Sequence, residues 1–274
     1  CIGLLGHPAV LPVFGPLAER ATLVSVGNPG RTDALEFRDG KLMLGKLNTI
    51  ADVNWERLLE VVGAQRLAAL VVDADLVACT NWTMLTEMDG ILDGLTALVP
   101  QGCATQFFFD LADPEKRSRE DVAGVLRRIA TLNNKARCIL GLNLREAEQV
   151  SEVLGIGDLP VEEARSVEAS AARIAQALGI HGVVVHAVRC AGAKVGDDRA
   201  GVDGPFCANP RLTTGAGDHF NGGFMSALVG GLDVRGALYA GVGTSGWYVR
   251  NARSPQRSDV TAFLRDWATG ALKD

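Results

Sequence analysis

Residues 213–220, Thr-Thr-Gly-Ala-Gly-Asp-His-Phe, combine residue types that suit the handling of an anion. Gly215 and Gly217 let backbone N–H groups approach an anion closely, and the apolar spacing that follows predicts a helix whose positive dipole end adds to the attraction. Asp218 would repel a phosphate at this place, so its presence indicates that it handles a proton beside the anion. An anion cradle next to a base is what a phosphoryl-transfer enzyme needs.

The elements that must position this segment alternate along the chain. Helical periodicity and short apolar runs follow one another from residue 55 onward. The predicted helices cover residues 55–70, 84–98, 118–134, 145–153 and 161–178, and the predicted strands cover 75–79, 105–109, 138–142 and 182–185. Strands that are apolar on both faces belong in a parallel sheet covered by helices on both sides. We therefore expect a three-layer α/β/α fold with a mostly parallel central sheet.

Polar residues stand where the predicted strands end. They are Asn81, Asp110, Asn143 and His186. Ligands of such sheets gather outside the carboxyl ends of the strands, so these side chains are expected to share one crevice. Asn81 and Asp110 are candidates for binding substrate hydroxyls. The alternative is that polar residues at strand ends cap the helices that follow.

Composition excludes some classes of function. The chain has 274 residues and a net charge of −5, which argues against a general nucleic-acid or anionic-membrane surface. It contains no uncharged stretch of about 20 residues, so no transmembrane helix is expected. The six cysteines form no C-x-x-C pair and no signal-peptide pattern opens the chain. Reduced thiols in a cytoplasmic protein are the simplest interpretation.

Two motifs together resemble a known family. Residues 213–224, TTGAGDHFNGGF, resemble the signature of the ribokinase-like sugar kinases, also called the phosphofructokinase B family. A second motif of that family, N-x-x-E, is present as Asn143-Leu-Arg-Glu146 at a predicted strand end. The resemblance covers about residues 70–265. It implies one ribokinase-like kinase domain over residues 1–274 and ATP-dependent phosphorylation of a hydroxyl on a sugar or sugar-like substrate.

The resemblance also implies roles for the residues of the signature. Asp218 is the general base that removes a proton from the attacking hydroxyl. The backbone N–H groups of Gly215, Ala216 and Gly217 hold the transferring phosphoryl group, and Thr214 binds the nucleotide. The alternative for Asp218 is a purely electrostatic contribution to the helix N-terminus.

For the second motif, the resemblance assigns Glu146 to Mg²⁺ and its waters, with Asn143 in support. Mg²⁺ commonly keeps several waters and few protein ligands, so one carboxylate is enough. A local interpretation stands beside this one, because Asn143 and Glu146 have the spacing of a capping box. Both interpretations can hold together.

Three further features are candidates for the nucleotide side. Arg189 stands where many relatives have Thr-Leu-Gly and is a candidate phosphate-binding cation, with a solvated arginine as the alternative. Residues 240–246, including Gly243, are unusually rich in small residues for a helix, and by resemblance they border the adenine pocket; close helix packing is the alternative. Asn251 and Ser254 would close that pocket or bind a monovalent cation such as K⁺.

On the acceptor side, residues 22–47 contain strand-like runs separated by a turn at 38–40, which predicts a β hairpin. It resembles the lid that these kinases place over the sugar. Arg31 and Thr32 are candidates for substrate contact, and a closed lid would exclude water. An exposed lid edge also suits pairing with a second copy, so a homodimer through the lid is expected.

The family normally carries an opening strand and a Gly-Gly segment upstream of the run at 1–5, and the expectation is that this chain lacks them. The partners expected overall are a sugar or sugar-like substrate, ATP and Mg²⁺, with no nucleic acid and no membrane. A nucleoside kinase and a non-catalytic nucleotide or sugar sensor remain alternatives. No motif names the acceptor.

Overall fold

The computed structural model of the chain describes residues 1–37, 40–157 and 160–272. The chain divides into two compact units, one of residues 1–74 and 81–100 and the other of residues 75–80 and 101–274. Each unit is described by itself. The expectation of one kinase domain over residues 1–274 stays a prediction.

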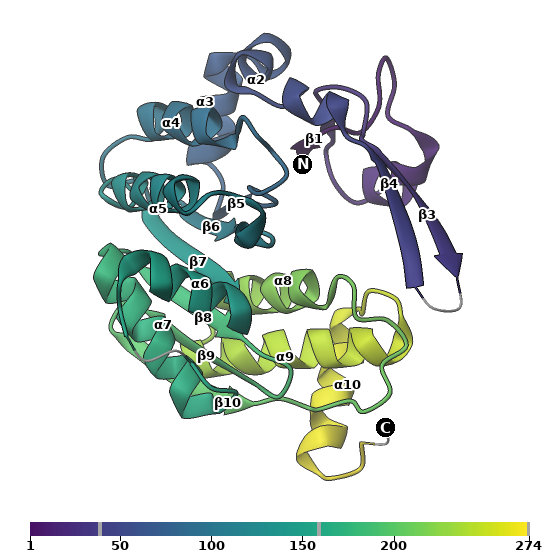
Figure 1. The fold of residues 1–274 in the computed structure, drawn as a ribbon, viewed down its shortest axis with the longest axis vertical. Helices are drawn as coiled ribbons and strands as arrows, with labels where there is room; N and C mark the ends of the chain where they lie inside the picture. The colour runs from purple at the N-terminus through teal and green to yellow at the C-terminus, as the bar shows by residue number, and fades with distance from the viewer. Residues whose placement is uncertain (38–39, 158–159, 273–274) are drawn as a thin grey trace. The chain divides into compact units, whose positions relative to one another are not determined.

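A six-stranded sheet forms the centre of the larger unit, counted over the described residues (Figure 1). In spatial order its strands are β10 (Asp198–Asp203), β9 (Cys190–Val195), β8 (Gly182–His186), β7 (Arg137–Asn143), β6 (Gln106–Asp110) and β5 (Leu76–Cys79). Strands β5 to β8 run parallel, and β9 and β10 form an antiparallel hairpin at one edge. The sheet is therefore mostly parallel, as predicted.

Helices cover both faces of this sheet (Figure 1). They are α5 (Arg119–Asn133), α6 (Leu144–Leu154) and α7 (Ala164–Leu178) on one side, and α8 (Ala216–Val229) and α9 (Val234–Asn251) on the other, with α10 (Arg257–Ala268) against α9 and the short η3 (Pro114–Lys116) before α5. Alternate residues of each strand point to opposite faces. Phe108 and Ile139 accordingly join Phe220 and Phe224 of α8 in one buried cluster, while Phe107 is buried toward the other layer. The three-layer architecture is confirmed.

The strand ends fall where the sequence places them. Asp110 is the last residue of β6, Asn143 of β7 and His186 of β8, and Asn143 pairs in register with His186. Because these strands are parallel, the three residues lie at one edge of the sheet. Asn81 follows β5 but belongs to the smaller unit.

The smaller unit contains one clear departure from the sequence prediction. The helix expected at 55–70 is two helices, α2 (Trp55–Val62) and α3 (Ala64–Val72). Gly63 between them has φ 83°, a left-handed value that a continuous right-handed helix does not allow. The prediction of a single helix was therefore wrong.

The remaining elements of the smaller unit are short. They are β1 (Ile2–Gly3), η1 (Pro12–Phe14), α1 (Gly15–Ala18), β2 (Val24–Ser25), β3 (Arg31–Phe37), β4 (Gly40–Lys46), η2 (Asn48–Asp52) and α4 (Met88–Leu98). Strands β3 and β4 form an antiparallel pair, and the predicted turn at 38–39 lies outside the described residues. Strand β2, which the prediction counted with the hairpin, pairs in parallel with β1 instead. The hairpin strands thus span 31–37 and 40–46.

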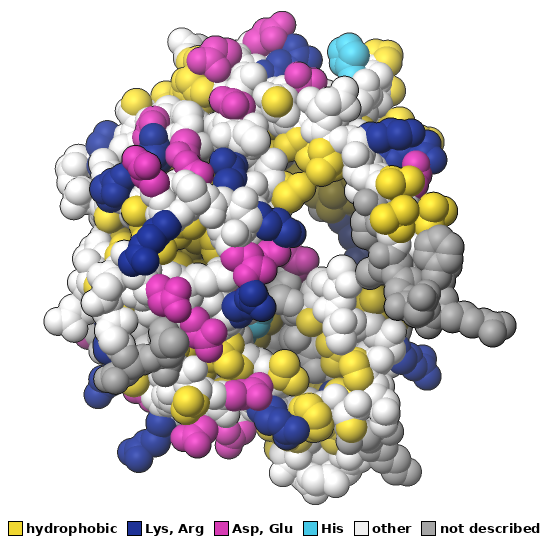
Figure 2. Space-filling view, in the orientation of Figure 1, with side chains coloured by type: hydrophobic (Ala, Val, Ile, Leu, Met, Phe, Trp, Pro, Cys, Tyr) yellow, Lys and Arg dark blue, Asp and Glu magenta, His cyan; other side chains and the backbone are white. Residues whose placement is uncertain are grey.

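The surface and the thiols agree with the composition. Acidic and basic side chains are interspersed over the face shown in Figure 2. All six cysteines are free thiols. Of the helices in the described part of the chain, none is both long enough and apolar enough to cross a membrane.

Candidate active site

A cavity of about 490 Å³ opens at the carboxyl ends of β7 and β8, entirely within the larger unit. Its walls come from these strand ends, the first turn of α8, one face of α9 and the segment 204–213. Its lining includes Asn143, His186, Cys207, Gly217, Val242 and Val249. Apolar surface dominates the part between α9 and the segment 204–213. At the start of α8 the lining residues are Ala216, Gly217 and Phe220.

The first turn of α8 is open toward this cavity. Gly215 is the N-cap, has φ 88°, and provides no side-chain cap. Ala216 N–H donates to the Thr213 carbonyl at 3.0 Å. Among the residues that the structure describes, none accepts a hydrogen bond from the N–H groups of Gly215, Gly217 or Asp218. Free N–H groups at a helix start bind anions. The predicted donors were Gly215, Ala216 and Gly217, but the N–H of Ala216 is already bonded to Thr213, and the N–H of Asp218 is free instead.

Asp218 lies in this first turn with its side chain exposed to solvent. Its Oδ2 atom is 3.8 Å from the point that a Cβ on Gly215 would occupy. Within the described part of the chain, the carboxylate takes part in no hydrogen bond or ion pair. An exposed carboxylate without a partner is free to accept a proton.

Asp110, at the end of β6, lies close enough to Asp218 for their charges to interact. Its Oδ1 accepts from Ala112 N–H at 2.9 Å and its Oδ2 accepts from Asn221 Nδ2 of α8 at 2.9 Å. Burial raises the pKa of Asp110, and the charge of Asp218 raises it further, while the two hydrogen bonds lower it. Asp110 thus connects the sheet edge to α8. Its proposed contact with substrate hydroxyls stays a prediction.

Asn143 and Glu146 form the capping box at the start of α6. Asn143 Oδ1 accepts from Glu146 N–H at 2.9 Å, and Glu146 Oε2 accepts from Asn143 N–H at 2.8 Å. Glu146 Oε1 accepts from Asp113 N–H at 2.8 Å. The side chain is only 6% exposed, so burial raises its pKa, with smaller contributions from the charges of Asp110 and Asp113. The local interpretation of this motif is confirmed.

The two carboxylate oxygens of Glu146 are the atoms that would bind a metal or its waters. Each of its oxygens accepts a backbone N–H, which leaves lone pairs for water but favours an outer position around a hydrated ion. In the described part of the chain, no group of three or more His, Cys, Asp or Glu side chains is arranged to hold a metal. A Mg²⁺ ion that keeps its waters would fit the two backbone-bonded oxygens of Glu146.

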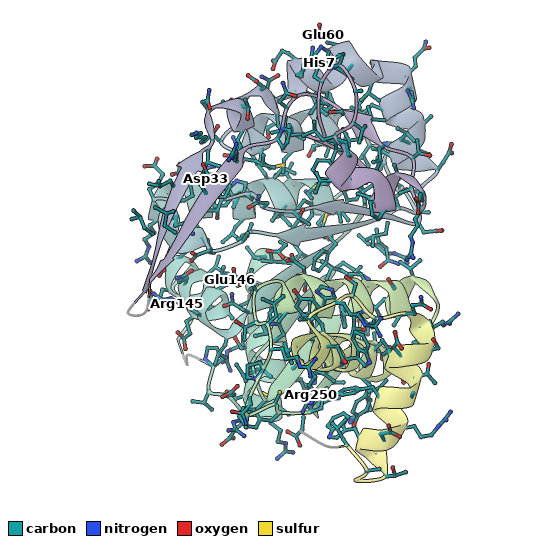
Figure 3. The ribbon with its side chains drawn as sticks, turned by 90° about the vertical axis from the view of Figure 1, so that its right-hand side faces the viewer. His7, Asp33, Glu60, Arg145, Glu146 and Arg250 are labelled. Atoms are coloured by element: carbon teal, nitrogen blue, oxygen red, sulfur yellow. The ribbon has the colours of Figure 1, made fainter. Side chains whose placement is uncertain are left out.

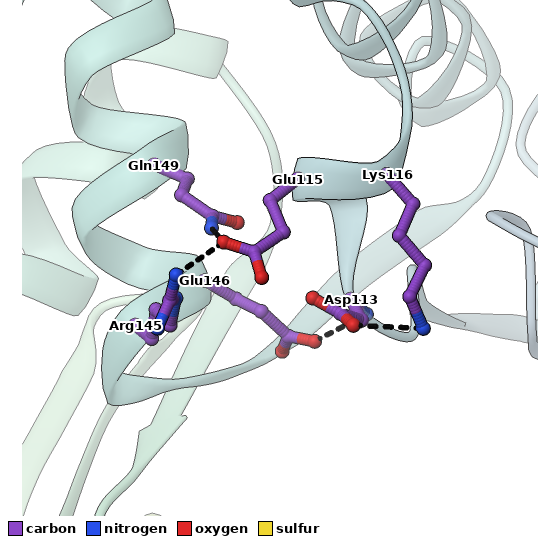
Figure 4. A network of polar contacts seen from close by, with 6 residues as sticks. All are labelled: Asp113, Glu115, Lys116, Arg145, Glu146 and Gln149. Atoms are coloured by element: carbon purple, nitrogen blue, oxygen red, sulfur yellow. Dashed lines mark hydrogen bonds and ion pairs between the residues drawn. The ribbon is translucent and has the colours of Figure 1, made fainter. Parts of the chain in front are cut away.

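A polar network supports this corner of the site (Figure 4). Arg145 donates to Glu115, and Gln149 Nε2 donates to the same carboxylate at 3.2 Å. Lys116 Nζ lies 3.0 Å from Asp113 Oδ2. The network ties η3 to the first turn of α6. Lys116 is also paired with the carboxylate of Asp113, and Arg145 of α6 with that of Glu115 of η3.

His186 forms the floor under the first turn of α8. A Cβ on Gly217 would lie 3.3 Å from its Cε1, and its ring centroid is 4.8 Å from that of Phe220. Burial lowers its pKa to about 4. The imidazole is therefore neutral near pH 7, and it contributes packing rather than a phosphate-binding charge.

Of the predicted nucleotide-binding residues, Arg189, Thr214, Gly243 and Asn251 are not among the residues that line the cavity, and neither is Glu146. Arg189 is exposed and its guanidinium lies 3.7 Å from the centroid of the Phe206 ring. The Thr214 carbonyl accepts the Tyr248 hydroxyl at 2.7 Å. The other two, Gly243 and Asn251, are in α9. Their nucleotide contacts stay predictions, and the structure gives them other neighbours.

In α9, Gly243 faces α10, since an added Cβ would lie 2.7 Å from Leu264. Asn251 Nδ2 donates to the Trp247 carbonyl at 2.8 Å. The cavity wall is built instead by Val242 and Val249, together with Ser245 and Gly246.

The sequence interpretation named the stretch 240–246 but singled out Gly243 within it, and it did not include Val249. The signal was available, because positions 242, 245, 246 and 249 have the i, i+3, i+4, i+7 spacing of one helix face. Arg250, labelled in Figure 3, supports the opposite wall. It donates to the carbonyls of Pro205 at 3.1 Å and Phe206 at 2.7 Å.

The predicted acceptor-side residues Arg31, Thr32 and Asn81 belong to the smaller unit. Arg31 Nε donates to Asp33 Oδ1 at 2.8 Å, and the side chain of Arg31 is 73% exposed and that of Asp33 38%. Asn81 has φ 64°, and its carbonyl accepts the N–H of Met84 at 3.2 Å, so it begins a turn. Their contact with a substrate stays a prediction.

Comparison with known proteins places this geometry in a family. Residues 1–267 match the family described as prokaryotic ketohexokinase. A ketohexokinase of Haloferax volcanii is 30% identical over 268 residues, which is 96% of this chain and 69% of that protein.

Solved structures share the fold at lower identity. A carbohydrate kinase from Agrobacterium tumefaciens superposes with a TM-score of 0.68 at 19% identity, over 96% of this chain and 79% of that one. Arabidopsis thaliana ribokinase, complexed with ribose and ATP, gives 0.68 at 18% identity, over 96% and 81%. Adenosine kinase from Schistosoma mansoni, in complex with 2-fluoroadenosine, gives 0.67 at 20% identity, over 95% and 76%.

Proposed function

This chain belongs to the prokaryotic ketohexokinase family, and we propose that it transfers the γ-phosphoryl group of ATP to a hydroxyl of a ketohexose. It is a carbohydrate kinase with a ribokinase-like fold, so the resemblance of the two motifs is confirmed. The observation that carries the proposal is the open first turn of α8 with the unpartnered carboxylate of Asp218 beside it.

Asp218 is the general base of this proposal. It would accept the proton of the attacking hydroxyl as the oxygen moves toward the γ-phosphorus, a contribution of about 10²–10⁴-fold. Asp110 lies near enough to interact electrostatically with Asp218.

The backbone of the same turn stabilises the phosphoryl group. The N–H groups of Gly217 and Asp218 are free of protein acceptors within the described residues. Such preorganised donors act where negative charge develops, and losing one typically costs about 10²–10³-fold in rate. The neutral His186 beneath the turn fills space without adding a charge.

The nucleotide would occupy the cavity beside this turn. Val242 and Val249 supply apolar surface for a base, and the start of α8 faces the phosphate end. Bound Mg²⁺ would neutralise phosphate charge. Glu146 would hold its waters at the edge of the site, as its burial and its two backbone hydrogen bonds suit an outer position.

The charge balance favours a neutral acceptor over a sugar phosphate. Lys116 of η3 is paired with Asp113, and Arg145 of α6 is paired with Glu115. A phosphorylated acceptor needs cations that are available for its phosphate.

The test is a transfer assay of the protein with ATP and Mg²⁺ against ketohexoses, aldohexoses, hexose phosphates and nucleosides. We expect a neutral ketohexose to give the highest kcat/KM. A nucleoside as the preferred acceptor would instead make the protein a nucleoside kinase. Binding of sugar and ATP without transfer across the whole panel would support a sensor and overturn the proposal.

The position of the nucleotide has its own test. Cys207 lines the cavity, whereas Cys1 is exposed elsewhere. A non-hydrolysable ATP analogue is expected to slow alkylation of Cys207 by iodoacetamide and to leave Cys1 unaffected, as followed by peptide mass spectrometry. Equal labelling of Cys207 with and without the analogue would contradict the assigned nucleotide position.

A further inference from the structure

His219, the residue after the proposed base, turns away from the cavity and binds the back of the signature turn. Its Nδ1 lies 2.7 Å from the Gly215 carbonyl oxygen and its Nε2 lies 2.9 Å from Ser254 Oγ. A carbonyl oxygen only accepts, so Nδ1 carries the hydrogen. In the neutral ring Nε2 then accepts the Ser254 hydroxyl. One side chain thus links α8 to the chain that follows α9.

Tyr248, near the end of α9, completes this arrangement. Its ring stacks on the imidazole of His219 with centroids 3.6 Å apart and planes 14° apart. Its hydroxyl donates to the Thr214 carbonyl at 2.7 Å. Two consecutive carbonyls of the turn, those of Thr214 and Gly215, are therefore held by side chains packed on each other.

Holding a carbonyl also fixes the next N–H group. In a planar trans peptide the C=O of one residue and the N–H of the next point in opposite directions. Fixing the Thr214 carbonyl on the α9 side turns the Gly215 N–H away from α9. Fixing the Gly215 carbonyl likewise sets the Ala216 N–H, which donates to Thr213 and closes the turn. Gly215 itself has φ 88°, a conformation that glycine leaves easily unless neighbours restrain it.

We propose that His219, with Tyr248 and Ser254, is a positioning residue that holds the phosphate-binding turn and the attached Asp218 in the geometry for transfer. The inference rests on the proposed function of Asp218. None of the three side chains lines the cavity. Their effect passes through the backbone of the turn, and a loosened turn lowers the rate of transfer more than the affinity for the acceptor.

Paired substitutions separate the contacts. His219→Phe keeps a ring for stacking on Tyr248 and removes both hydrogen bonds, and Tyr248→Phe removes only the bond to Thr214. His219→Asn retains an amide donor near the position of Nδ1. His181→Asn is the matched control, because His181 lies just before the first residue of β8, at the end of the strand away from the cavity. We expect kcat to fall about tenfold in His219→Phe, equivalent to 1.4 kcal/mol, with the acceptor KM nearly unchanged and partial recovery in His219→Asn.

The double variant His219→Phe/Tyr248→Phe is expected to lose less than the product of the single losses, because both contacts restrain one turn. Unchanged kcat in His219→Phe, or a loss shared equally with His181→Asn, would overturn the inference.

Amide hydrogen exchange supplies a second measurement that needs no activity. Exchange should rise in His219→Phe for peptides covering 213–218 and stay constant for those covering 143–146. Equal protection of residues 213–218 in the wild type and in His219→Phe would also overturn the inference. A wild-type protein without transfer activity defeats the proposed function, and the exchange result still decides whether His219 restrains the turn.

Discussion

Helices α6 and α8 begin beside the same cavity, and each has an acid in its first turn, yet their N-termini differ. The start of α6 is closed, because Asn143 and Glu146 satisfy each other's backbone N–H groups. The start of α8 is open, because Gly215 has no side chain to cap it. At both helix starts an acid follows a strand or a turn, but only the start of α8 leaves backbone N–H groups available for an external anion.

The two acids differ in the same way. Glu146 is 6% exposed and accepts two backbone N–H groups, whereas Asp218 is exposed and has no partner in the described chain. A carboxylate with its oxygens already bonded maintains local structure. A carboxylate without partners is free to exchange a proton with a ligand. Availability, rather than position in the helix, separates a supporting acid from a base.

The largest effect is expected at Asp218. Asp218→Asn keeps the size of the side chain and removes its basicity, so kcat should fall about 10²–10⁴-fold. Binding of ATP, measured by calorimetry, should be nearly unchanged because the N–H groups of the turn remain. Glu120→Gln, an exposed first-turn acid of α5, is the control and should keep full activity. Transfer at the normal rate by Asp218→Asn would show that the base is elsewhere.

Glu146 should affect the ion more than the chemistry. Glu146→Gln removes the charge that would hold the waters of Mg²⁺, and outer-position partners of metals typically contribute 10–100-fold in affinity. The Mg²⁺ concentration for half-maximal rate is expected to rise by about that factor, measured at saturating ATP and acceptor. Glu152→Gln, a more distant and exposed charge on the same helix, should change it little. An unchanged Mg²⁺ dependence in Glu146→Gln would reject this role.

A substitution at Asn143 tests the capped start of α6 separately from Glu146. Asn143→Ala leaves the Glu146 N–H without its acceptor, and loss of such a cap typically costs about 0.5–2 kcal/mol of unfolding free energy. Urea denaturation measures that loss. The rate of transfer at saturating Mg²⁺ should fall only a few-fold. A rate loss as large as that of Asp218→Asn would contradict the distinction between the two helix starts.

Much of this comparison could be predicted from local sequence. The capping-box spacing at Asn143 and the glycine-rich start of α8 are contained in a few consecutive residues, and the strand ends at Asp110, Asn143 and His186 follow from apolar runs. Local patterns of this kind are set by neighbours in sequence.

The parts that escaped prediction depend on distant segments. The second bond to Glu146 comes from Asp113, and the contacts of His219 come from Tyr248 and Ser254. No spacing rule brings these residues together: the packing of η3 on α6 brings Asp113 to Glu146, and the packing of α8 on α9 brings Tyr248 to His219. For the same reason the contact of Arg189 with the Phe206 ring could not be predicted from the sequence.

The smallest effect concerns the stability contributed by Asp110. The sign of its change with pH distinguishes a buried acid from an acid that caps a helix. Burial raises the pKa of Asp110 in the folded protein above its unfolded value. Its favourable contribution is therefore complete below the unfolded pKa, about 4, and is lost as the pH rises through the folded pKa. Asp110→Asn, in which an amide oxygen can still accept from Ala112, avoids that loss. Its unfolding free energy should exceed that of the wild type near pH 7, with the difference shrinking on acidification.

Asp121, in the capping box of α5, should behave in the opposite way. Hydrogen bonds from Ser118 lower its folded pKa, so its stabilisation is present above the unfolded pKa and disappears as the pH falls through the folded one. Asp121→Asn should therefore be less stable than the wild type near pH 7, and the difference should vanish in acid. Urea titrations of both variants between about pH 2 and 8 compare the two slopes directly, because the change at Asp121 lies mostly below about pH 4 and that at Asp110 mostly above it. Slopes of the same sign would mean that burial does not dominate at Asp110, and the carboxylate would then have to be stabilised by its bonds to Ala112 and Asn221.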